Sequence, residues 1–330
     1  MRRRGVLHIG VTGLAAMLVQ ACSEGSTTNP GAGSNPSARS SAPSGEPQAG
    51  STLDPSGYVP AAQPIAQLKK LYSYDQSSTL NANLTDRRSG DGVILEDITY
   101  SDTRGNDSIP AYVVSADIPG DTLRMPAIVL ATGPDGDRDK LLDEATALAR
   151  MKALVMVPAV PVKPTADASA DAKMMAAAVL AHRRAFDLLI RRTDCDPSRV
   201  GFAGHHSGAA LGSVVMALET RITAAVLAGG TSRFSRWLVK QKVPADWHAY
   251  LDSLSRFDAG PYVAAGGKRS VLLQFGKTDT VVPEAERTEL VGQVAGAKQR
   301  KDYETGHDLM KFPAAVADRA AFLKQVLRLS

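Results

Sequence analysis

The sequence predicts a doubly wound α/β fold, in which a mostly parallel sheet carries helices on both of its faces. Apolar runs of strand length alternate with stretches of helical periodicity from residue 127 onward. One of these runs ends in Gly204 and turns sharply into a helix of small residues, and polar residues follow two later runs. Such alternation is typical of a parallel sheet, whose ligands bind at the carboxyl ends of the strands.

The expected strands and helices can be placed by periodicity. Order is predicted to begin near residues 63–71 and to continue in an antiparallel hairpin of residues 93–100 and 109–115. Buried parallel strands are predicted in the run that ends at Gly204 and at residues 127–131, 153–157, 224–228, 271–276 and 298–303. Helices are predicted after the turn as far as Leu218 and at residues 140–150, 170–192, 284–294 and 314–329.

Length and composition are those of an ordinary globular protein. The chain has 330 residues, of which 44% are apolar and 22% are charged. Its net charge is +4, and Arg2, Arg3 and Arg4 supply three of these charges. The remainder of the sequence shows no basic stripe, so nucleic-acid binding is not expected.

The first 21 residues are predicted to be a signal peptide of the lipoprotein type. Three arginines precede a short apolar stretch at residues 6–19, and Cys22 follows Ala21 directly. This arrangement resembles a bacterial lipoprotein box, so we expect a lipid on the Cys22 thiol and an exported protein anchored to a membrane of the cell envelope. Cleavage at an ordinary site nearby is the alternative, and the arginines fit general or twin-arginine export.

Residues 22–62 are predicted to form a disordered tether, and residues 63–330 the α/β domain. Serine, glycine and proline dominate the tether, and Leu53 is the only large apolar residue between residues 23 and 53. Once Cys22 is lipidated, Cys195 has no second cysteine with which to form a disulfide, and it is expected to be structural.

The sharp turn after Gly204 has the layout of a nucleophile elbow. Such an elbow reads G-x-S-x-G, with glycines two places before and after the tip because a side chain there would clash. Here Gly204 and Gly208 flank His206, and the serine comes one place later, at Ser207. With Ser207 at the tip, His205 would occupy a position that needs a very small residue, so His206 is predicted to be the tip.

Two further polar residues complete a constellation with the elbow. Asp279 lies in the turn after the strand at residues 271–276, and His307 follows the last strand. Taken singly, Asp279 could cap the next helix and His307 could be a surface loop residue. Together they give the chain order nucleophile, acid, histidine, in which the acid orients an imidazole that takes the proton of the nucleophile.

These motifs resemble the α/β-hydrolase superfamily, near its dienelactone-hydrolase-like and acyl-esterase members. The resemblance covers about residues 70–330. The sequence stretches that carry it include residues 149–155, 196–201, 221–227 and 276–283. It implies hydrolysis of carboxylic esters or related acyl bonds, with a small acyl or ester ligand and no cofactor. It assigns the reaction to the elbow residue together with Asp279 and His307.

The sequence departs from the family pattern around the elbow and the oxyanion loop. Besides the histidine at the tip, Thr132-Gly133 replaces the usual His-Gly, and Pro134 has no N–H at a position that often donates one to the oxyanion. Asp135 is an alternative donor, and the Ser207 N–H remains available. The activity is therefore expected to be weak or lost. The alternative is a non-catalytic pseudo-hydrolase that binds a ligand or partner in the former active-site pocket.

Two alternatives about the surroundings of the site remain open. Residues 231–262 are predicted to be a cap insertion that either walls an apolar pocket or packs its own core, with the aromatic residues Phe234, Trp237, Trp247, Tyr250, Phe257 and Tyr262. A metal site of His206 and His307, with Asp279 behind His307, is a weak possibility because two imidazoles are too few ligands. No metal is therefore expected.

Overall fold

A computed structural model describes residues 54–103, 108–118 and 123–330, which belong to one compact unit. The predicted signal peptide, the lipidation site Cys22 and most of the predicted tether lie outside the described residues. Within the described ranges, no helix is both long enough and apolar enough to cross a membrane.

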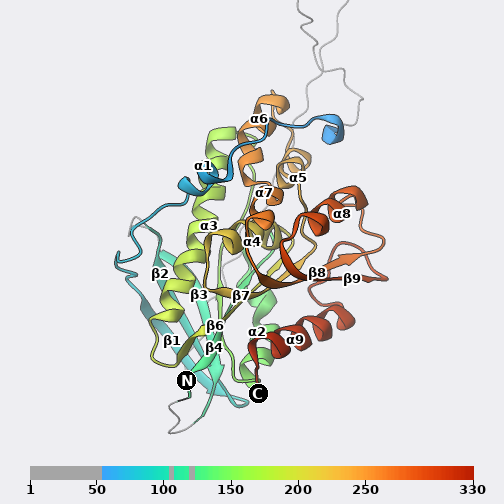
Figure 1. The fold of residues 1–330 in the computed structure, drawn as a ribbon. Helices are drawn as coiled ribbons and strands as arrows, with labels where there is room; N and C mark the ends of the chain where they lie inside the picture. Colours follow the sequence, from blue (N-terminus) through green and yellow to red (C-terminus); the bar gives the residue numbers. More distant parts are fainter. Residues whose placement is uncertain (1–53, 104–107, 119–122) are drawn as a thin grey trace, which may run out of the picture. The chain divides into compact units, whose positions relative to one another are not determined.

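The core of the structure is a nine-stranded sheet in the order β1-β2-β3-β5-β4-β6-β7-β8-β9 (Figure 1). Neighbouring strands are parallel from β5 through β9, whereas β1, β2 and β3 are antiparallel to their neighbours. The predicted doubly wound, mostly parallel sheet is therefore confirmed. The strands are β1 (Asn83–Gly90), β2 (Val93–Ser101), β3 (Ser108–Ala116), β4 (Met125–Ala131), β5 (Leu154–Pro158), β6 (Cys195–His205), β7 (Ile222–Ala228), β8 (Arg269–Gly276) and β9 (Gly296–Tyr303).

The edge strand β1 is the one strand that the sequence patterns missed. Its residues, Asn-Leu-Thr-Asp-Arg-Arg-Ser-Gly, are exposed at every position. Because neither face of β1 is buried, it has no alternation of apolar and polar residues to detect. Its partner β2 carries the buried positions, and the pairing of the two backbones decides the structure of β1.

Helices cover both faces of the sheet and bury two separate cores. On one face, α2 (Leu142–Arg150) and α9 (Pro313–Leu327) pack with alternate residues of the central strands, such as Ile128. The residues between them, such as Val129, face α3 (Ala168–Ile190), α4 (Ser207–Leu218) and α8 (Glu284–Gln293). The central strand β4 is buried along its whole length for this reason.

The predicted cap insertion contains α5 (Phe234–Gln241), α6 (Trp247–Leu254), a 3-10 turn at Ser255–Phe257 and α7 (Ala259–Ala264). Five of its six aromatic residues are buried in the same core as α3 and α4, and Trp247 packs against that core. The aromatic residues therefore join the main core of the domain and do not form a separate core of the insertion. Trp237 alone among these aromatics also makes a ring contact with the elbow.

Ordered structure begins earlier than the composition indicated. Residues 54–62, assigned to the tether, include a 3-10 turn at Pro55–Gly57, and α1 (Ile65–Lys70) follows. Arg236 of α5 donates hydrogen bonds to the carbonyls of Ser56 and Tyr58 at 2.8 and 2.9 Å. These bonds satisfy backbone groups of a segment that has few apolar side chains.

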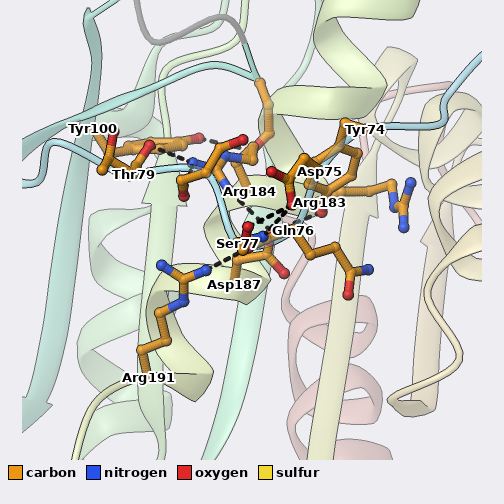
Figure 2. Close-up of polar contacts among 12 residues, drawn as sticks. Tyr74, Asp75, Gln76, Ser77, Thr79, Tyr100, Arg183, Arg184, Asp187 and Arg191 are labelled. Carbon is orange, nitrogen blue, oxygen red and sulfur yellow. Dashed lines mark hydrogen bonds and ion pairs between the residues drawn. The ribbon is translucent and has the colours of Figure 1, made fainter.

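A buried ionic network fastens the segment before β1 to α3 (Figure 2). Arg184 is fully buried, forms an ion pair with Asp187 at 3.4 Å, and donates to the carbonyls of Ser78 and Thr79. The Tyr74 hydroxyl donates to Asp187 at 2.7 Å. The apolar pattern of α3 gave no sign that Arg184 and Asp187 would be buried, because the segment that covers them, residues 74–79, lies far away in the sequence.

Candidate active site

The structure places His206 at the tip of the sharp turn between β6 and α4. His206 has φ 58° and ψ −118°, whereas Ser207 is already the first helical residue. A positive φ is strained for a non-glycine residue and is typical of functional turns. In the structure, the backbone of the turn therefore reverses at His206.

The two flanking glycines permit this turn because their neighbours leave no room for a side chain. A Cβ on Gly204 would lie 2.3 Å from the Gly208 carbonyl oxygen, and one on Gly208 would lie 2.5 Å from the Thr132 carbonyl oxygen. Both distances are far below any van der Waals contact. Histidine could not occupy either position, which excludes the register that puts Ser207 at the tip.

The Ser207 side chain is not exposed to the cavity beside His206. The residue is fully buried, and its Oγ has no hydrogen-bond partner among the described residues. Its backbone N–H lies at the start of α4, where the first amides of a helix have no partner within the helix. Ser207 therefore offers the site an amide and not a hydroxyl.

Asp279 and His307 form the predicted hydrogen bond. Nδ1 of His307 lies 2.8 Å from Oδ2 of Asp279, and the other carboxylate oxygen accepts from the amides of Val281 and Val282. Burial opposes ionisation of Asp279, but these bonds outweigh it and lower the pKa of the carboxyl. A carboxylate held in this way fixes the orientation and the tautomer of the imidazole.

The ring of His307 faces the elbow. Its centroid lies 4.2 Å from that of His206, with the ring planes at 89°, and the His206 ring also contacts Trp237 at 5.2 Å. Burial and the nearby His307 lower the pKa of His206 to about 4, so His206 is neutral at neutral pH. Nε2 of His307 is buried and has no hydrogen-bond partner among the described residues, so it can exchange a proton with a bound group.

A cavity of about 450 Å³ opens over these residues. This volume is within the range of small-molecule sites. It lies at the carboxyl ends of β4, β6 and β7, where a parallel sheet binds ligands. Its lining residues are Gly133, Pro134, Asp135, Lys140, His205, His206, Ala228, His307, Asp308, Leu309, Met310 and Lys311. Four predicted site residues therefore line the cavity, namely Gly133, Pro134, His206 and His307. The predicted residues Asp279, Ser207, Gly204 and Gly208 do not line it.

Backbone hydrogen bonds hold the loop that follows β4 in place. Pro134 in this loop has no N–H that could donate to an oxyanion. The Gly136 N–H donates to the Gly133 carbonyl at 3.1 Å, and the Pro134 carbonyl accepts from Val162 at 2.9 Å. A Cβ on Gly136 would lie 2.5 Å from the Pro161 nitrogen, so the loop is packed tightly against residues 161–162. The Asp135 carboxylate is engaged with Lys140.

A second polar group beside the cavity was not foreseen from the sequence. The buried His205 lines the cavity, and its Nε2 lies 3.3 Å from Oε2 of Glu144. Arg319, also buried, donates to both Glu144 oxygens at 3.0 and 2.9 Å and to the carbonyls of Leu309 and Met310. Although burial opposes ionisation, His205 and Arg319 lower the pKa of Glu144 to about 2. Arg319 thereby anchors the loop that carries His307.

The described residues contain no cluster of three or more histidine, cysteine, aspartate or glutamate side chains arranged to hold a metal ion. The metal hypothesis places Asp279 behind His307 as a partner of its ring, and the hydrogen bond between these two side chains is present. Cys195 is buried, and burial raises the pKa of its thiol to about 11. The thiol is therefore protonated at neutral pH and poorly nucleophilic, as expected for a structural cysteine.

Comparison with known proteins identifies the fold through similar structures and not through similar sequences. The sequence matches no family model and no curated protein. The structure is similar to an acetyl xylan esterase from Paenibacillus sp. R4, with a TM-score of 0.63 at 17% identity, covering 80% of this chain and 100% of that one. Acetyl xylan esterase 1 from Thermoanaerobacterium sp. JW/SL YS485 gives 0.65 at 17%, covering 81% and 95%.

A protein named as a dienelactone hydrolase, from Klebsiella pneumoniae, is similar with a TM-score of 0.54 at 13% identity, covering 72% of this chain and 98% of that one. The chain has the α/β-hydrolase fold. In this fold the elbow, the acid and the histidine follow successive strands of one sheet. Here His206 follows β6, Asp279 follows β8 and His307 follows β9.

Proposed function

We propose that this protein is a slow carboxylic-ester hydrolase that binds a small acyl ester over His206. The observation that carries the proposal is the contact between the neutral His206 ring and His307, which is itself hydrogen-bonded to Asp279. The similarity of the fold to two acetyl xylan esterases supports the same class of reaction. The cavity of about 450 Å³ gives the ester a place to bind.

The chemistry follows from the two imidazoles. The lone pair of neutral His206 attacks the ester carbonyl carbon, and the ring proton that this releases passes to Nε2 of His307. Asp279 stabilises the cation that forms on His307. His307 then protonates the departing alkoxide, which leaves an acyl-imidazole on His206. Water hydrolyses this acyl group, so that ester and water become carboxylic acid and alcohol and both histidines are regenerated.

Three features make this route slow. An imidazole at the tip is bulkier than a hydroxymethyl group and crowds the acyl carbon. Two imidazoles in contact also compete for a single proton. The Ser207 amide remains as an oxyanion donor, but Pro134 removes the usual second one, and one such donor contributes roughly 3–4 kcal/mol of transition-state stabilisation.

The test is turnover of a short-chain aryl ester by wild type, His206→Ala, His307→Ala and the matched control Ser207→Ala. We expect slow hydrolysis that is lost in both histidine variants and kept in Ser207→Ala. Turnover that survives in His206→Ala would refute the role of His206. Binding of the ester without any turnover would instead favour the pseudo-hydrolase alternative.

We also propose that the protein is exported and anchored to a membrane by a lipid on Cys22. The support is the sequence at residues 1–22, where arginines, a short apolar stretch and Ala21-Cys22 follow one another. The tether that follows would let the α/β domain reach ligands some distance from the bilayer surface.

A further inference from the structure

A second cavity adjoins the first, on the face of the sheet that α2 and α9 cover. It has a volume of about 290 Å³ and lies between α2 and α9, which cover the same face of the sheet (Figure 1). The two cavities share Lys140, Met310 and Lys311 as lining residues. The two cavities therefore adjoin one another at these three residues, and the second is here called the α2–α9 groove.

The groove is lined mainly by apolar side chains. Ala147 and Leu148 come from α2, and Val316 and Ala320 come from α9. Of its two acidic residues, Glu144 already accepts two hydrogen bonds from Arg319. The groove therefore offers few polar partners for the hydroxyl groups of a sugar, whereas a hydrocarbon chain needs none.

The junction between the cavities is held in a fixed position and suits a chain of this kind. Arg319 binds the carbonyls of Leu309 and Met310, so the loop that forms one side of the junction is anchored from beneath. Lys140 is ion-paired with Asp135, and the aliphatic stems of Lys140 and Lys311 can cover apolar groups while their ammonium ends stay in water.

We propose that the α2–α9 groove is the acyl-chain subsite of the His206 site, and that the preferred ligand is an ester of an unbranched fatty acid of about eight carbons. This inference rests on the proposed function, because it places the carbonyl of that ester beside His206. An acetyl group fills only part of a cavity of about 450 Å³ and leaves the groove empty. Each methylene that is fully buried strengthens binding by about fourfold.

The experiment compares p-nitrophenyl butyrate with p-nitrophenyl octanoate for wild type, Ala320→Phe and Ala317→Phe. Ala320 lines the groove, whereas Ala317 is exposed on the same helix outside it and receives the same substitution as a control. We expect wild type to prefer the octanoate by at least about tenfold in kcat/KM. Ala320→Phe should lose most of this preference, and Ala317→Phe should keep it.

A binding measurement separates this inference from the proposed reaction. Sodium octanoate and sodium butyrate are titrated by calorimetry, and Trp237 fluorescence serves as a second signal because its ring contacts His206. Octanoate that binds at least about tenfold more tightly, and loses this advantage only in Ala320→Phe, supports the subsite even if no ester is hydrolysed. Equal binding of the two acids, or a preference that Ala320→Phe leaves intact, would overturn it.

Discussion

Replacing His206 with serine should raise the rate of ester hydrolysis at this site. Nδ1 of His307 is already hydrogen-bonded to Asp279 at 2.8 Å, and Nε2 of the same ring has no hydrogen-bond partner among the described residues. The backbone at residue 206 has the φ of 58° that a nucleophile elbow uses, and the two flanking glycines maintain it. A serine hydroxyl placed there would face the ring that now contacts the imidazole of His206.

The expected gain can be worked from this geometry. A complete serine triad contributes roughly 10⁶-fold in kcat, and one missing oxyanion donor costs roughly 10²–10³-fold. About 10³–10⁴-fold then remains for His206→Ser. In wild type, proton transfer by His307 to and from the crowded His206 nucleophile contributes roughly 10²-fold. We therefore expect His206→Ser to exceed wild type by about 10- to 100-fold. Adding Pro134→Gly should lower the barrier further, by up to a few kcal/mol, because it supplies an N–H in a loop that Val162 holds in place.

The assay is kcat/KM for a short-chain aryl ester, with circular dichroism to check that each variant is folded. His206→Ser combined with His307→Ala is the control that should return the rate to background. A folded His206→Ser variant no faster than wild type would refute the reasoning. Robust wild-type turnover that depends on His206 would show instead that the histidine is already an efficient nucleophile or base.

Three further predictions concern stability and location. Burial lowers the pKa of His182 to about 4, below its unfolded value near 6.5, so the unfolded state binds more protons between these values. The free energy of unfolding should fall by up to about 3 kcal/mol from pH 7 to pH 4 on this account, and urea titrations of His182→Phe should show a shallower fall; an unchanged fall would contradict the assignment. Arg184→Met removes the buried donor to the Ser78 and Thr79 carbonyls, whereas Asp187 keeps its ion pair with Arg221 at 2.9 Å. The substitution should therefore cost about 1–3 kcal/mol in the same titration at pH 7, and a loss below about 1 kcal/mol would mean that the network of Figure 2 is not stabilising. Cys22→Ala should move the protein from the detergent phase to the soluble exported fraction, and unchanged partitioning would argue against lipidation.

The sequence determined the features of this protein that depend on neighbouring residues. The buried runs of β4 and β8 and the periodicity of α3 follow from the repeat of each element, so their positions could be predicted closely. The elbow could be predicted because the clash that requires a glycine at Gly204 is with Gly208, within five residues of chain. The clash that requires Gly208 is with Thr132, at the end of a different strand. The expectation that the elbow, Asp279 and His307 lie in one site then followed from the convergence of parallel strand ends at one edge of a sheet.

Only the tertiary structure decided which distant groups share the site and its surroundings. Glu144 and Arg319 are 175 residues apart, and neither lies in a motif, yet together they hold His205 and the loop after His307. The aromatic residues of α5, α6 and α7 had two possible roles because burial depends on what packs against a helix, which local composition does not contain. The α2–α9 groove has the same origin. Most of its lining residues belong to α2 and α9, and their common cavity exists only because the sheet brings those two helices together.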